Sequence, residues 1–274
     1  MKTKIFAFLL ALVMLLSLTA CGQKKTDGGE SKMGTIDDLL DFNAFSKHKN
    51  EIHKEVEMAP PELMTYSNLS AALLAMEAGQ ITNLSVSKST ADYIAARNDK
   101  FKVNAKTEAK NDNSHFSMLI SDDNTALYDI LNNGIKQLKA DGTLDKLIAE
   151  DLNAYITSDP APEALPTFDG AATYKIAVTG DMPPMDFVTA DGKAAGFNVA
   201  LLTEIANIAK VNFELVMVDS GARLTSLASG AVDAVFWMES GGCFFCGEIL
   251  SAAPEGTILT ESYFSDVPMF LTLK

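Results

Sequence analysis

The segment that decides the fold class is residues 197–237, which read FNVALLTEIANIAKVNFELVMVDSGARLTSLASGAVDAVFW. Apolar residues recur at three- and four-residue steps in its first part, which predicts a helix with one buried face. Runs rich in β-forming residues follow, separated by a shorter helical stretch. With the strand just upstream, the expected elements are a strand at Tyr174–Val178, a helix at Phe197–Ala209, a strand at Asn212–Val218, a helix at Ala222–Ala228 and a strand at Val232–Trp237. This order predicts an α/β fold with a parallel sheet that helices cover.

The upstream half of the chain carries helical signals of its own. Apolar residues again recur at helical steps over Thr125–Ala140, which predicts a long helix with one buried stripe. Near the start of this half, Thr35–Asp38 predicts a capped helix start, because a threonine precedes two acidic residues. We assign core positions, and no function, to the apolar residues of these helices.

A repeated pattern links the two halves. One predicted helix ends at Gly79, and a strand begins at Ile81. Another predicted helix ends at Gly230, and Val232 begins a strand at the same spacing. A glycine after a helix permits a left-handed turn, and β-branched residues favour strands. The pattern indicates two related α/β lobes that face each other across a cleft, although helix, glycine and strand also recur by chance in α/β proteins.

The N-terminal residues have the features of an export signal. Two lysines precede an apolar run at 5–16, which is shorter than the roughly 20 residues that span a bilayer. Leu18–Cys21 resembles the bacterial lipobox, whose cysteine is lipid-modified. We therefore predict a lipoprotein signal peptide at 1–20, lipidation of Cys21 and a flexible tether at 21–33. A plain secretory signal and a buried apolar helix are the alternatives.

Composition narrows the function classes and the domain plan. The chain has 274 residues and a net charge of −14, and a surface this acidic repels phosphate backbones, which excludes nucleic-acid binding. Three cysteines are too few for a fold built on disulfides. Prolines cluster in the segment 157–170 and predict an extended linker there. We expect this linker to separate two lobes, at 34–156 and at 171–274.

Several motifs together resemble one known family. In the second half they are a strand leading into Pro183-Pro184 and a hairpin at 174–192, then Gly196-Phe197, LASGAVDAV at 227–235 and ESYFSD at 261–266. In the first half they are Tyr66–Gly79, Thr90–Tyr93 and Leu138–Leu144. The combination resembles bacterial extracellular solute-binding proteins of family 3, the amino-acid-binding type of ABC transporters. The resemblance implies an α/β, two-lobed periplasmic-binding-protein-like fold of type II. It also implies a circularly permuted lobe order, since the lobe at 34–156 is similar to the family's second lobe and comes first here.

The candidate site lies at strand ends. Ligands of parallel sheets bind beyond the carboxyl ends of the strands. The candidate ligand-binding residues are Thr179, Asp181, Met182, Ser220, Arg223, Trp237, Glu239 and Ser240, with Ser87 from the other lobe. Met182 and Trp237 could form apolar walls, and Arg223 could hold an anion. The structural alternatives are Asp181 as a turn residue, Arg223 as a surface ion pair and Trp237 as a core residue.

Two charged anchors of the family are missing. In its amino-acid binders an arginine follows the third strand of this lobe and clamps the ligand carboxylate, and an aspartate of the other lobe meets the ligand amine. Here residues 238–246 contain no arginine, and Ser87 stands in the place of the aspartate. We therefore expect weak or no binding of simple α-amino acids. The remaining acidic and hydroxyl groups suit a cationic ligand better than an anionic one.

Cys243 and Cys246 form a CxxC motif after a predicted strand. This spacing suits a disulfide, a pair of free thiols or a thioredoxin-type redox pair. Metal binding is poorly supported, because the three histidines of the chain all lie in the other half. No nucleophile triad spacing or phosphate loop is present in the sequence, so we expect no enzyme activity, no metal site and no cofactor.

The resemblance implies a solute-binding protein of an ABC importer. Such a protein would be a monomer outside the cytoplasm, at the cell surface or in the periplasm, held to the membrane by the lipid on Cys21. Its partners would be a small polar solute, such as an amino acid or a related compound, and an ABC permease in the cytoplasmic membrane. The alternatives are a sensory or degenerate binding lipoprotein without a transport role and, less favoured, an extracytoplasmic thiol oxidoreductase that uses Cys243 and Cys246.

Overall fold

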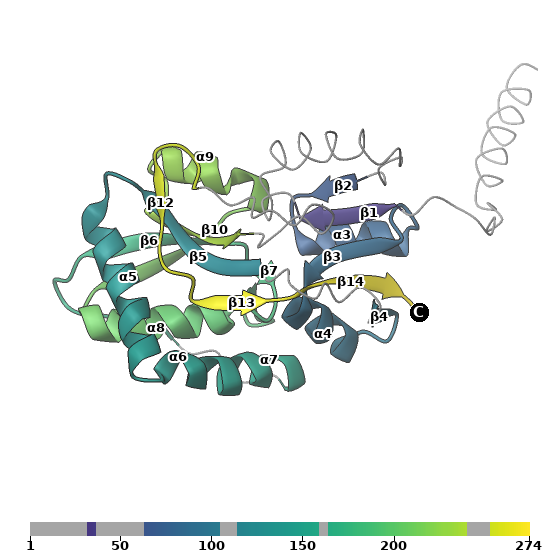
Figure 1. Ribbon diagram of the computed structural model, residues 1–274, viewed down its shortest axis with the longest axis horizontal. Helices are drawn as coiled ribbons and strands as arrows, with labels where there is room; N and C mark the ends of the chain where they lie inside the picture. The colour runs from purple at the N-terminus through teal and green to yellow at the C-terminus, as the bar shows by residue number, and fades with distance from the viewer. Residues whose placement is uncertain (1–31, 37–62, 105–113, 159–163, 240–252) are drawn as a thin grey trace, which may run out of the picture. The chain divides into compact units, whose positions relative to one another are not determined.

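The computed structural model of the protein describes residues 32–36, 63–104, 114–158, 164–239 and 253–274 (Figure 1). Within these ranges the strands form two larger sheets and one small sheet, and helices connect them. The predicted α/β class is therefore confirmed. The permuted lobe order stays a prediction.

The first sheet has five strands and is mixed. Its spatial order is β2 (Leu63–Tyr66), β1 (Met33–Ile36), β3 (Asn83–Ser87), β14 (Pro268–Leu273) and β4 (Phe101–Asn104). Strands β2, β1 and β3 run parallel, whereas β14 runs antiparallel to both of its neighbours. In Figure 1 the yellow C-terminal strand accordingly lies among the blue strands of the N-terminal part.

The second sheet repeats this plan. Its spatial order is β10 (Asn212–Met217), β6 (Thr173–Val178), β11 (Ala234–Glu239), β5 (Ser114–Ser121) and β12 (Thr257–Leu259), and β13 (Phe264–Asp266) also pairs with β5. Strands β10, β6 and β11 run parallel, as the sequence predicts, and β5 runs antiparallel to β11. The third sheet is a small meander of β7 (Asp181–Met182), β8 (Asp186–Val188) and β9 (Ala194–Ala195).

The helices expected at Thr125–Ala140, Phe197–Ala209 and Ala222–Ala228 are among those of the described ranges. The described ranges contain α3 (Leu69–Glu77), α4 (Lys88–Arg97), α5 (Thr125–Ala140), α6 (Thr143–Lys146), the π-helix η2 (Leu147–Leu152), α7 (Asn153–Thr157), α8 (Phe197–Ala209), the 3-10 turn η3 (Ser220–Ala222) and α9 (Arg223–Ala228). The helices expected at 125–140 and 197–209 have the predicted bounds. None of these helices combines the length and the apolar character that crossing a membrane requires.

The helix start expected at Thr35–Asp38 is wrong over its described part. Met33–Ile36 form strand β1, which lies between β2 and β3 and pairs with both. Two residues of this strand are β-branched and buried, which suits a central strand. At Gly34 a Cβ atom would lie 2.5 Å from Cδ1 of Ile81, so the absence of a side chain allows close packing. The neighbouring strands, which the local sequence cannot show, decide the conformation.

The chain crosses from one large sheet to the other at positions that differ from the expected lobe boundaries at 156 and 171. Strand β5 and helix α5, expected in the first lobe, belong to the second sheet and pack against β11 and α8 respectively. Conversely β14, expected in the second lobe, lies inside the first sheet. The chain thus passes between the sheets from β4 to β5 and again from β13 to β14. The proline-rich segment instead joins α7 to β6.

The predicted repeat between the two halves appears in the sheets. Strands β3 and β11 each occupy the third position of their sheet, and each follows a helix that ends near a glycine. Gly79 has a φ of +73° and Gly230 a φ of +71°, so both adopt the left-handed conformation that favours glycine. The fourth position in each sheet is filled by an antiparallel strand from elsewhere in the chain.

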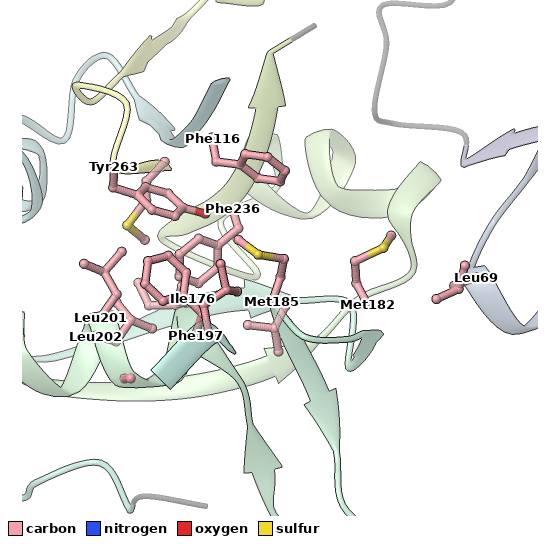
Figure 2. Close-up of a cluster of buried hydrophobic side chains, with 14 of the residues drawn as sticks. Leu69, Phe116, Ile176, Met182, Met185, Phe197, Leu201, Leu202, Phe236 and Tyr263 are labelled. Atoms are coloured by element: carbon pink, nitrogen blue, oxygen red, sulfur yellow. The ribbon is translucent and has the colours of Figure 1, made fainter. Parts of the chain in front are cut away.

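One extended apolar cluster carries most of the core (Figure 2). Around β5, β11 and α8 it contains an aromatic group in which Phe197 lies 6.1 Å from Tyr263 and 5.6 Å from Phe264, between ring centroids. The same cluster includes Leu69, at the start of α3, and Met182, on β7. The core therefore reaches the place where the loops after β6 and β10 meet helix α3.

Candidate ligand-binding site

Three loops meet at the N-terminal end of helix α3. The N-cap residue, just before this helix, is Asn68, whose Oδ1 accepts a hydrogen bond from the Ala71 amide at 2.9 Å. From the loop after β6, Oδ2 of Asp181 accepts a bond from the Ser70 amide at 3.1 Å. From the loop after β10, the Ser220 amide donates to the Ser67 carbonyl at 3.2 Å. The ends of two parallel strands of the second sheet are thereby joined to a helix of the first sheet.

Asp181 is a partly buried carboxylate with unused hydrogen-bonding capacity. Burial raises its pKa, the charges of Asp186 and Asp219 raise it further, and the hydrogen bond from Ser70 offsets part of the shift. Although Oδ2 is bonded, Oδ1 is buried and has no hydrogen-bond partner within the described part of the chain. The residue therefore does more than shape a turn, since it braces α3 and leaves one oxygen to accept a further bond.

Ser220 is the second residue with an unused polar atom. It is 1% exposed, and its Oγ has no hydrogen-bond partner among the residues that the structure describes. Buried polar atoms without a partner are uncommon, because the desolvation of each costs about 1–3 kcal/mol. Two such oxygens near one helix end indicate a place for a ligand group that donates hydrogen bonds.

Apolar side chains border this region. Met182 follows Asp181 directly and is 8% exposed, and Leu69 is the first residue of α3 and is 2% exposed. Figure 2 shows both side chains at one side of the buried cluster, with Met182 between Met185 and Leu69. Met182 therefore lies where the predicted apolar wall was expected, packed into the core.

Thr179 belongs to a buried hydrogen-bond network. Its Oγ1 donates to Oδ1 of Asp186 at 2.7 Å, and the Gly180 amide donates to the same oxygen at 2.9 Å. The other oxygen, Oδ2, accepts from Nδ2 of Asn198 at 2.8 Å, and Oδ1 of Asn198 accepts from the Tyr263 hydroxyl at 3.0 Å. Burial holds the pKa of Tyr263 well above its usual value. The hydroxyl of Thr179 is thus engaged in fixing the turn that presents Asp181.

Arg223 is buried, so the alternative of a surface ion pair is wrong. The residue is 4% exposed, and its Nη1 donates to the main-chain carbonyl of Phe236 in β11 at 2.8 Å. Its positive charge also lowers the pKa of Tyr263, against the larger effect of burial. This contact joins the first turn of α9 to β11.

Ser87 lies at the start of α4, in a group of buried hydroxyls. Its Oγ donates to Oγ1 of Thr90 at 3.0 Å and lies 3.3 Å from Oγ of Ser89. Beside this group, the Asp266 carboxylate at the end of β13 accepts from the Ser89 amide at 2.8 Å. Burial raises the pKa of Asp266, and its hydrogen bonds from Ser89 and Val267 oppose the shift.

The remaining predicted residues can be placed only in part. The backbone register puts Trp237 opposite Ser117 and Glu239 opposite His115 on β5. Ser240, Cys243, Cys246 and Cys21 lie outside the described residues, as do the predicted signal peptide and most of the tether. In the described ranges, no group of three or more His, Cys, Asp or Glu side chains could hold a metal ion.

Comparison with known proteins gives one family match. Residues 174–238 match the family described as bacterial extracellular solute-binding proteins, family 3. The match covers the strand, hairpin, helix and strand that carry Thr179, Asp181, Met182, Ser220 and Arg223. No curated protein sequence matches the chain.

Solved structures with a similar arrangement have low sequence identity. One is the ligand-binding component of an ABC-type import system from Staphylococcus aureus with zinc bound, at 10% identity and a TM-score of 0.45, covering 88% of this chain and 65% of that one. Another is the periplasmic aliphatic sulphonate-binding protein SsuA from Escherichia coli, at 10% identity and a TM-score of 0.37, covering 89% and 65%. A third is the GluR0 ligand-binding core from Nostoc punctiforme with L-glutamate, at 8% identity and a TM-score of 0.39, covering 89% and 85%. This chain thus spans less than two thirds of the length of the first two structures.

Sequence reasoning missed the partners of the predicted residues. An asparagine before an apolar helical stretch is a recognisable cap, so Asn68 could have been identified. The bond between Ser70 and Asp181 joins residues 111 positions apart, and no local pattern indicates it. Asp186 and Asp266 likewise look like ordinary turn residues until their buried partners are known.

Proposed function

We propose that the protein is a lipid-anchored, extracytoplasmic solute-binding protein that captures a small polar solute and presents it to an ABC importer. The observation that carries the proposal is the meeting of Asp181, Ser220 and the first turn of α3, where two buried oxygens have no partner among the described residues. The family match over residues 174–238 supports it, because these residues include both strand ends.

Ligand capture would use contacts from both sheets. Asp181 and Ser220 follow strands of the second sheet, whereas Ser67 and Ser70 precede and begin a helix of the first. A solute that bonds to groups of both sheets stabilises the state in which they are close, and this is the mechanism of hinge closure. The described passage of the chain from β13 to β14 would serve as part of the hinge.

The experiment that tests the proposal is a thermal-shift screen of the purified chain against amino acids, amines, small organic anions and sugars. A bound solute at about 100 times its dissociation constant adds about 2.7 kcal/mol to the free energy of unfolding, which raises the melting temperature measurably. If no solute class stabilises the protein, the proposal fails. If the protein binds a solute but does not interact with an ABC permease, the alternative of a sensory binding lipoprotein is favoured instead.

Simple α-amino acids are expected to bind weakly or not at all. Their carboxylate needs a cationic partner, and the candidate, Arg223, is 4% exposed and directs its Nη1 to the Phe236 carbonyl of β11. An unpaired carboxylate that enters a site beside Asp181 and Asp219 loses hydration without gaining a charge-assisted bond. Calorimetry with the twenty amino acids tests this expectation, and submicromolar binding of any of them would contradict it.

The anchor can be tested separately. Replacing Cys21 by alanine should release the protein from the membrane fraction, because the lipid would have no attachment site. Retention of the Cys21→Ala variant after high-salt washing would show that another segment holds it.

A further inference from the structure

Two oxygens near the start of α3, Asp181 Oδ1 and Ser220 Oγ, have no hydrogen-bond partner among the described residues, and both can accept a hydrogen bond. A carboxylate oxygen such as Asp181 Oδ1 can only accept hydrogen bonds, and the Ser220 hydroxyl can also accept. A ligand group that satisfies Asp181 Oδ1 must bring a donor, and a second donor on the same group can satisfy Ser220 Oγ as well. A primary ammonium group has three N–H donors and no acceptor, and a charge-assisted bond to a carboxylate is stronger than a neutral one.

The charges around Asp181 also favour a cation. The carboxylates of Asp186 and Asp219 are near enough to influence it. The amides that a helix start could offer to an anion are in use, since Ser70 donates to Asp181 and Ala71 donates to Asn68. An anionic ligand group would therefore meet negative charge and find the helix amides occupied.

The surroundings suit an organic amine better than a metal ion. In the described part of the chain, no group of three or more His, Cys, Asp or Glu side chains could coordinate one. The buried side chains of Met182 and Leu69 belong to the apolar cluster that adjoins this place. Such side chains pack against the methylene groups of an alkylamine.

We propose that Asp181 and Ser220 form an ammonium subsite and that the captured solute is an organic amine. This inference rests on the proposed function and specifies the class of solute. Asp181 Oδ1 and Ser220 Oγ accept bonds from the ammonium, Asp181 Oδ2 keeps its bond to the Ser70 amide, and the aliphatic part of the amine lies against Met182.

Titration calorimetry on the detergent-solubilised full chain tests the subsite. The probes are putrescine, ethanolamine and propylamine, with butanediol as the uncharged analogue of putrescine and succinate as an anion of similar length. At least one amine should bind, whereas butanediol and succinate should not. Asp181→Asn preserves the size of the side chain and should weaken the amine by about tenfold or more, because a charge-assisted bond is lost. Ser220→Ala should weaken it by a smaller factor.

The matched control is Asp191→Asn. Asp191 lies on the exposed hairpin between β8 and β9, where its carboxylate accepts from Thr189 and pairs with Lys193, so amine affinity should not change. Amine binding that neither Asp181→Asn nor Ser220→Ala weakens would overturn the subsite. Binding of succinate or butanediol in place of every amine would overturn the amine class while the solute-binding proposal stands. If neither these probes nor the wider solute screen binds, both proposals fail.

Discussion

Asp186 shows how a single residue can organise the candidate site without facing a ligand. Its two oxygens accept bonds from Thr179, Gly180 and Asn198, and the residue is 4% exposed. Both oxygens must be acceptors for this arrangement, so a carboxylate fits it and a side-chain amide does not. The turn fixed in this way carries Asp181 into contact with α3.

Replacing Asp186 by asparagine should therefore destabilise the protein by about 1–3 kcal/mol, because an amide NH₂ would face one of the existing donors. Urea unfolding of Asp186→Asn measures the effect, and the exposed Asp191→Asn variant is the control, with a nearly unchanged midpoint expected. An Asp186→Asn protein as stable as the parent would mean that the network rearranges without cost.

For single residues, the sequence indicates which ones lie near the site better than it indicates their hydrogen-bond partners. Asp181 and Ser220 could be singled out because both follow predicted strands. Their unused oxygens could not be foreseen, since each depends on contacts with a helix more than 100 residues away in the chain. Arg223 was ambiguous for a related reason: its position near a strand end does not show that its guanidinium turns inward to β11.

At the scale of elements, two helices beside the first sheet receive carboxylates from strands of the other two sheets. Asp181 accepts from the second residue of α3, and Asp266 accepts from the second residue of α4. Each carboxylate lies at the positive end of a helix dipole, which partly offsets the cost of its burial. The pKa of both groups is nevertheless raised, so burial outweighs the favourable contacts.

The sign of the Asp266 shift predicts an unusual pH dependence. Because its folded pKa lies above the ordinary value of 3.8, the folded protein binds this proton more tightly than the unfolded chain does. The stabilisation is complete below the unfolded pKa and is lost as pH rises through the folded pKa. The free energy of unfolding of the parent, relative to Asp266→Asn, should therefore fall as pH rises from about 3 to about 7.

Asp141 provides the opposite control for this experiment. Hydrogen bonds from Thr143 hold the pKa of its exposed carboxyl below the ordinary value. Relative to Asp141→Asn, the parent should gain stability as pH rises through that range. Equal slopes for Asp266→Asn and Asp141→Asn would contradict the assigned direction for Asp266.

The glycine before α8 gives a second test at the scale of elements. Gly196 has a φ of +112°, and a Cβ there would lie 2.4 Å from the Met185 carbonyl oxygen. Gly192 has a φ of +79° in open space, so Gly192→Ala should cost only about 1–2 kcal/mol from its backbone conformation. Gly196→Ala should cost clearly more, as measured by urea unfolding, because main-chain atoms must also move. Similar costs for the two variants would show that the Met185 carbonyl shifts freely.

Element bounds were predictable where local signals agree. Helices α5 and α8 have long apolar stripes, and their ends coincide with the expected ones. Strand β1 has only four residues, and a threonine before acidic residues also suits a helix cap. Residues 33–36 form a strand because they pair with β2 and β3, and a local sequence pattern does not show such tertiary pairing.

At the scale of the whole molecule, each large sheet is completed by a strand from a distant part of the chain. Strand β14 lies between β3 and β4, and β5 lies between β11 and β12. The expected lobe boundaries followed composition and the prolines of the linker. The sequence does not show that β5 and β14 join the sheet of the other half, because their composition is that of any short apolar strand.

Removing residues 268–274 should accordingly unfold the first sheet. Met269 and Leu271 of β14 are 5% and 0% exposed, and the strand separates two others that have no direct contact in the sheet order. Hydrogen exchange should show lost protection in β3 and β4. Deleting Lys274 alone is the control, since it removes a backbone bond to Lys100 and an exposed ion pair with Asp99 at the sheet margin. Retained protection of β3 and β4 in the shorter chain would show that β14 is dispensable.

The late position of β14 also sets an order of events during biosynthesis. Strands β1 to β4 leave the ribosome early, yet the fourth place of their sheet stays empty until β14 (Pro268–Leu273) has been made. Domains with contiguous sequences fold as they emerge, whereas contacts between distant segments must wait and make folding slow. The first sheet therefore cannot close until β14 has been made, so β1 to β4 stay incompletely folded while the intervening residues are being synthesised.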